Sequence, residues 1–158
     1  MKTIQSIISV AAIAVGLSAP ASAGLNDPEI IVYRFTGVRD DGGAQGVGIA
    51  AAFECTNFSG ANENLRFVTR DAFAVLKSNV VQFIGHLGTV TMTTHNVNGI
   101  TVTAGLGTGA VGMGSTAVAA TSPNVLCGAR TIDATGNNPF NSIPLPKIRF
   151  NSAPGSEE

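Results

Sequence analysis

The sequence predicts an all-β protein, built as an antiparallel β-sandwich of about seven to nine short strands. Three observations predict this fold. Apolar and polar residues alternate with a period of two through most of the chain. Turn-forming residues interrupt this alternation about every 8–12 residues. No part of the chain alternates strand patterns with helix patterns, so a parallel α/β sheet is not expected.

The chain begins with the features of a secretory signal peptide. Lys2 supplies a positive charge, residues 7–17 form an apolar run, and Ala21-Ser22-Ala23 is an A-x-A cleavage site. We therefore expect residues 1–23 to be removed and the protein to be exported to the periplasm or the extracellular space. The apolar run is shorter than the roughly 20 residues of a membrane-spanning helix. No integral membrane span is expected after signal removal.

The rest of the chain is predicted to form one sandwich domain, 24–135, followed by a proline-rich C-terminal tail, 136–158. Charged residues make up 12% of the sequence and the formal net charge is −1, so there is no broad basic field for nucleic acid. With one tyrosine and no tryptophan, the chain is poor in aromatic platforms for bases or sugars. Nucleic acid is therefore not an expected partner.

The strongest strand pattern is Gly46–Asn57, which we expect at the centre of the core. Val47, Ile49, Ala51, Phe53 and Cys55 share its apolar face. The other predicted strands are 30–38, 65–70, 74–84, 89–95, 100–104, 116–121 and 125–133. Asn98-Gly99 predicts a tight hairpin turn that joins 89–95 to an antiparallel return strand. In the tail, repeated prolines exclude a central strand, so 143–150 is expected along an edge and the last residues are expected to be disordered.

The two cysteines, Cys55 and Cys127, lie on the inward faces of predicted strands. In an exported chain they predict one disulfide, and the alternative is two separate buried thiols. The pair resembles the inter-sheet bridge of immunoglobulin-like sandwiches in architecture. The chain lacks a tryptophan to pack on the bridge, and Val125 stands where a tyrosine-corner domain has tyrosine. Composition and size also resemble fimbrial pilins, whose C-terminal alternating strand is not matched by SAPGSEE.

Two further motifs point to no cofactor. Gly107–Gly112 formally matches G-x-G-x-x-G and Asp133 follows at a suitable distance, but no helix pattern comes after the glycines. We interpret the segment as a glycine-rich loop or a thin strand with bulges. His86 and His95 have no cysteine or carboxylate at metal-ligand spacing, so both are expected in surface or turn positions. We expect no metal and no other cofactor.

No catalytic constellation is visible. The carboxylates available for a pair are Asp40, Asp41, Glu54, Glu63, Asp71 and Asp133. Glu54 interrupts a run of small apolar residues, and we interpret it as an outward-facing strand residue. Asp40-Asp41 lacks the further oxygen ligands of a calcium loop and is expected in a solvated turn. There is no G-x-S-x-G motif. No catalytic residue is assigned, and we expect a protein that is not an enzyme.

The sequence favours a non-enzymatic binding or surface-interaction module with a protein or glycan partner. Its contact surface is expected in loops. The loop candidates are Arg39, Asp40, Asp41, Asn57, Asn62 and Glu63. One alternative is a subunit of a surface assembly joined by strand addition, with 143–150 as the donor or edge element. The other is a secreted hydrolase with no visible site. The ligand and the oligomeric state are not indicated.

Overall fold

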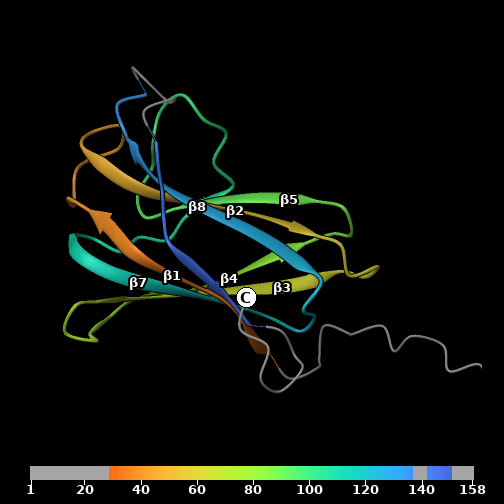
Figure 1. Ribbon diagram of the computed structural model, residues 1–158. Helices are drawn as coiled ribbons and strands as arrows, with labels where there is room; N and C mark the ends of the chain where they lie inside the picture. Colours follow the sequence, from red (N-terminus) through yellow and green to blue (C-terminus); the bar gives the residue numbers. More distant parts are fainter. Residues whose placement is uncertain (1–28, 137–141, 151–158) are drawn as a thin grey trace, which may run out of the picture.

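The computed structural model describes residues 29–136 and 142–150, which form two β-sheets packed face to face (Figure 1). None of these residues is helical, so the described chain contains no helix able to cross a membrane. The predicted signal peptide, 1–23, and the last residues of the predicted tail, 151–158, lie outside the described residues.

The two sheets have five strands each. Sheet A has the order β10 (Lys147–Arg149), β1 (Ile30–Asp40), β7 (Val111–Ala120), β3 (Glu63–Asp71) and β4 (Leu76–Ile84). Sheet B has the order β6 (Ala104–Gly105), β5 (Thr89–Thr93), β2 (Ile49–Asn57), β8 (Val125–Asp133) and β9 (Ile143–Pro144). Apart from β5 and β6, all the paired strands are antiparallel. The predicted antiparallel sandwich is confirmed.

Buried aromatic rings join the two sheets. Phe53 of β2 packs against Phe35 of β1, with ring centroids 5.6 Å apart, and against Phe67 of β3, at 6.2 Å. All three side chains are fully buried. Because side chains alternate along a strand, burying Phe35 and Phe67 turns their sequence neighbours toward solvent on the outer face of sheet A.

The central position predicted for Gly46–Asn57 is correct, but its first part is not in the core. Strand β2 begins at Ile49, and both Val47 and Ile49 are largely exposed. The apolar alternation therefore continues beyond the end of the sheet. Ala50 and Ala52, on the opposite face, are fully buried because a loop covers that face.

The predicted hairpin at Asn98-Gly99 is wrong. The segment after β5 returns and runs parallel to it, so that Met92 pairs with Ala104 in β6. The intervening loop instead lays Val97, Ile100 and Val102 over sheet B, where they pack in one cluster with Ala50, Ala52, Ile132 and Ala134. Burial of this apolar set outweighs the local turn preference of the dipeptide.

Cys55 and Cys127 form the predicted disulfide, with Sγ atoms 2.11 Å apart. The immunoglobulin-like position expected for it is wrong. The two residues lie directly opposite each other on β2 and β8, which are neighbours in sheet B, with Cα atoms 4.2 Å apart. An inward-facing cysteine fits a bridge between sheets and a bridge within a sheet equally well, so the sequence pattern does not distinguish them.

The C-terminal segment contributes one short edge strand to each sheet. Strand β9 pairs with β8, and β10 pairs with β1. Leu145, between them, is buried in the core. The segment considered as a strand donor is therefore paired within its own chain in this structure.

The glycine-rich segment ends in strand β7, which lies between β1 and β3. Gly114 is needed there, because a Cβ atom at this position would collide with the carbonyl oxygen of Arg70. Gly107 and Gly109 precede the strand with positive φ angles. The segment is thus a glycine-rich loop that leads into a thin strand.

We predict that removing the disulfide costs about 4 kcal/mol of unfolding free energy, because it closes a long loop in the unfolded chain. Its two cysteines are 72 residues apart. The measurement is urea unfolding of the protein and of a Cys55→Ala, Cys127→Ala double variant. A loss below about 1 kcal/mol would contradict the prediction.

Candidate functional site

Three of the residues predicted to form a loop contact surface are buried. Asp40, Asn57 and Glu63 are at most 2% exposed. The Asn57 amide donates to the carbonyls of Ala61 and Ile84, and its Oδ1 accepts from the N–H of Ser59. Glu63 accepts a hydrogen bond from the hydroxyl of Thr121. These polar residues satisfy buried backbone and side-chain groups at strand ends, so they are not available to a partner.

Asp40 and His95 form a clasp at one end of the sandwich. His95 Nδ1 lies 2.9 Å from Asp40 Oδ2, and His95 Nε2 lies 3.1 Å from the carbonyl oxygen of Val47. Asp40 also accepts hydrogen bonds from the N–H of Gly42 and the hydroxyl of Thr108. The clasp thus joins the end of β1 to three loops. The sequence-based interpretation of Asp40 in a solvated turn is wrong, because Asp40 ends β1 and is buried. His95 lies in a bend after β5, which is one of the turn positions expected for it, and its ring takes part in the clasp.

Asp41 extends the clasp toward β2. Its carboxylate accepts from the N–H groups of Gly43, at 3.1 Å, and Ile49, at 2.9 Å. Gly48 has a φ of 78°, and a Cβ atom there would overlap the Asp41 carboxylate. These two backbone hydrogen bonds lower the pKa of Asp41 below its usual value of 3.8, and the bond from Ile49 has the larger effect.

Asp40, Asp41 and His95 each offer one possible ligand atom for a metal ion, all within 4.8 Å of one another. Both ring nitrogens of His95 already face oxygen atoms, and both carboxylates hold backbone N–H groups. A metal ion would have to replace these bonds. The three side chains therefore connect the loops through hydrogen bonds, and nothing in their geometry requires a cation.

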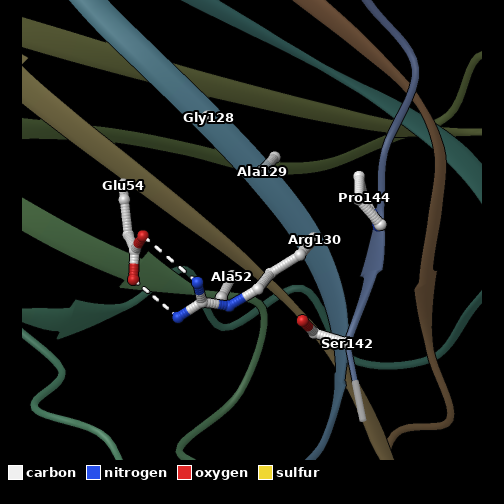
Figure 2. A pocket seen from close by; sticks show the side chains of 7 residues that line it. All are labelled: Ala52, Glu54, Gly128, Ala129, Arg130, Ser142 and Pro144. Atoms are coloured by element: carbon white, nitrogen blue, oxygen red, sulfur yellow. Dashed lines mark hydrogen bonds and ion pairs between the residues drawn. The ribbon is translucent and has the colours of Figure 1, made fainter. Parts of the chain in front are cut away.

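Glu54, the most interesting carboxylate in the sequence, lines a pocket on the outer face of sheet B. Figure 2 shows it paired with Arg130, whose two terminal nitrogens donate to the Glu54 oxygens at 2.7 and 3.3 Å. The pocket has a volume of about 250 Å³, with Ser142 and Pro144 on its far side. Glu54 is the single carboxylate among its described lining residues. Its charge is neutralised by Arg130, and glycosidases use a pair of carboxylates.

A different arrangement lies on the outer face of sheet A, and we call it the arginine trough. Its walls are Arg34 on β1 and Arg66 and Arg70 on β3, and its floor is Ser115, Ala117 and Ala119 on β7. The cavity between them has a volume of about 350 Å³. Small side chains on β7, set between longer ones on both neighbours, produce the depression.

The strand register sets the spacing of the three guanidinium groups. Ala117 pairs with Arg34 on one side and with Val68 on the other, so Arg34 stands level with the midpoint between Arg66 and Arg70. Arg66 and Arg70 are four residues apart on one strand, about 13 Å. The strands β1 and β3 are separated by two strand spacings, about 10 Å. The result is a triangle of cations around a shallow apolar floor.

The three arginines differ in their partners. Arg66 donates to Glu29 at 2.6 and 3.1 Å and to Asn79, and the hydrogen bond with Glu29 raises the pKa of Arg66. Arg70 donates to the carbonyl oxygen of Ala74. Arg34 has no hydrogen bond or ion pair to any described residue. Glu29 is the one carboxylate among the described lining residues, so three cations face one anion there and these residues carry a net charge of +2.

We predict that Asp41→Asn changes how stability depends on pH. The lowered pKa of folded Asp41 means that the unfolded chain takes up the proton first as the pH falls. Its stabilisation is therefore present above about pH 4 and is lost as the pH falls through the folded value. Urea unfolding should show the variant less stable at pH 7 by at most about 1 kcal/mol, because solvent screens this exposed carboxylate, with the gap closing below about pH 4. A gap that is independent of pH would contradict this.

Comparisons with protein-family models, with curated proteins and with solved structures found no match to this chain. What the protein binds must therefore follow from the chemistry of its own surface. Among the described surface features, the arginine trough combines a cavity, an uncompensated charge and an unpaired cation.

Proposed function

We propose that this chain is an exported, non-enzymatic binding module that holds an acidic polysaccharide in the arginine trough. The single observation that carries the proposal is Arg34, an exposed guanidinium without a described partner that faces two further arginines across a floor of small side chains. An unpaired guanidinium beside a cavity presents several N–H donors in a planar fork, which matches a carboxylate.

The lining of the trough favours a sugar acid over a bare inorganic anion. Ala117, Ala119, Val68 and Ile31 supply apolar surface along the floor and sides. A uronate unit carries a carboxylate on a ring whose C–H groups can cover such a surface. The cavity volume of about 350 Å³ lies within the range of small-molecule sites, about 300–1,000 Å³.

Nucleic acid fits this surface less well. The described residues that line the trough include no aromatic side chain, so they offer bases no stacking platform. The chain as a whole has a net charge of −1, and its cationic surface is local. The few cations of the trough are enough to bind a polymer with one carboxylate per sugar. The phosphate backbone of a nucleic-acid duplex is bound most strongly by a broad basic surface.

The proposal of a non-enzymatic role rests on the same lining. In the described part of the chain, Glu29 is the single carboxylate of the lining, and it is engaged by Arg66. Acid–base cleavage of a glycosidic bond uses two carboxylates on opposite sides of the bond. Export is supported by the signal-like N-terminus of the sequence and by the Cys55–Cys127 disulfide, which is typical of an oxidising compartment.

We predict that Arg34→Ala weakens binding of oligogalacturonate about tenfold, because it removes charge-assisted hydrogen bonds to one carboxylate. Isothermal titration calorimetry measures the affinity. The matched control is Arg39→Ala, which removes an exposed arginine of the same strand that does not line the trough. High salt should weaken wild-type binding. Equal affinity of the Arg34 variant and the wild type, or equal binding of a neutral dextran, would contradict the proposal.

We predict the opposite effect for Glu29→Gln. The Glu29 carboxylate occupies two nitrogens of Arg66, and the change frees this guanidinium and raises the net charge of the trough to +3. The affinity for oligogalacturonate should increase several-fold in the same titration. Glu54→Gln is the control, because that carboxylate is paired with Arg130 on the other sheet. A weaker affinity of the Glu29 variant would show that its carboxylate helps to hold the ligand.

A further inference from the structure

Three of the four sheet edges in the described chain are protected against pairing with another strand. Strands β6 and β9 have two residues each, and β10 has three. Pro144 lies within β9 and Pro146 directly precedes β10. Short strands and prolines are the usual means by which proteins blunt sheet edges.

The fourth edge, β4, is protected only at its start, where a bulge lies at Lys77. It is nine residues long, contains no proline and carries a single charge, Lys77. Its outward-facing residues include Leu76, Val81 and Phe83, which are 50%, 43% and 52% exposed. The strand therefore combines a row of backbone groups that faces away from β3 with exposed apolar side chains. A long apolar edge of this kind favours strand addition.

We propose that two copies of this chain associate through β4, edge to edge and antiparallel, with Val81 at the two-fold axis. In this register Val81 lies opposite Val81 of the second copy, and Phe83 lies opposite Asn79 and diagonal to Val81 on the same face. Directly opposed and diagonal apolar pairs are the contacts that stabilise neighbouring antiparallel strands. Val81 and Phe83 of each copy therefore contact one another across the pair of strands.

The single charge of the strand supports this register and a second copy as the occupant. With Val81 at the centre, the Lys77 residues of the two copies stand eight residues out of register, about 26 Å apart along the strands. A centre closer to Lys77 would bring the two like charges together. The register thus keeps the two lysines apart, and the same residues of both copies form the contact, as in the isologous interface of a two-fold dimer.

The pairing would join two copies of sheet A into one continuous sheet. An antiparallel two-fold axis runs perpendicular to the sheet, so both outer faces point the same way. The floors of the two arginine troughs, on β7 of each copy, would then be five strand spacings apart, about 24 Å. If the proposed function holds, one polysaccharide chain can engage both troughs, which raises its avidity. The association itself does not depend on that function.

Sedimentation of the purified protein over a wide concentration range tests the proposal. We expect a monomer–dimer equilibrium, and Val81→Lys should raise the dimer dissociation constant at least tenfold. The control is Leu126→Lys, a residue 50% exposed on β8, which belongs to sheet B and not to the β4 edge. This control should dimerise like the wild type. Far-UV circular dichroism and a thermal melt establish that each variant is folded.

Cross-linking distinguishes this dimer from any other. Val81→Cys should form a disulfide-linked dimer on mild oxidation, whereas Leu126→Cys should not. A monomer at every concentration, dimerisation of Val81→Lys equal to the wild type, or a dimer that Val81→Cys does not cross-link would each overturn the proposal. A monomer that instead binds an added peptide of alternating apolar residues at β4 would also overturn it, because the edge would then serve another partner.

Discussion

The contact of Phe53 with Phe35 and Phe67 is the interaction on which the rest of the molecule depends. Phe53 belongs to β2 in the middle of sheet B, while the other two rings belong to β1 and β3, on either side of β7 in sheet A. One side chain thus fixes the two strands that flank β7 against the opposite sheet. The nearby disulfide ties β2 to β8 and completes the inner layer of sheet B.

This core contact also determines the outer face of sheet A. Arg34 precedes Phe35 and Arg66 precedes Phe67, so burial of each ring turns the arginine before it to the opposite side of the strand. Between these strands, β7 presents the small residues Ser115, Ala117 and Ala119 outward at the floor of the trough. The arginine trough therefore results from two constraints together: aromatic residues held inside on both flanking strands, and small residues on the strand between them.

Much of the fold follows from local alternation. The pattern 125–133 predicts β8 to the residue, and 65–70 lies within β3 with both arginines outward. Alternation also places Cys55 and Cys127 on the inward faces of their strands and predicts that they pair. It does not show that these strands are neighbours in one sheet, because that depends on the strand order. The hairpin expectation fails because Val97, Ile100 and Val102 find a larger apolar surface on Ala50 and Ala52 than a tight turn would give them.

The candidate site depends on long-range register, which local patterns do not contain. Arg34 faces the β3 arginines only because β7, distant in sequence from both strands, inserts between β1 and β3. The clasp of Asp40 and His95 joins residues 55 positions apart, and no spacing in the sequence links them. Polar residues that resemble free loop contacts, such as Asn57 and Glu63, are instead used to satisfy hydrogen bonds at strand ends.

The most direct test of the central claim is to map the binding surface residue by residue. In a ¹⁵N-labelled sample titrated with trigalacturonate, the amide chemical shifts should change along the arginine trough. The residues expected to respond are Arg34, Arg66, Val68, Arg70, Ser115, Ala117 and Ala119. Shifts centred on the Glu54–Arg130 pocket, or no localised change at any ligand concentration, would contradict the account.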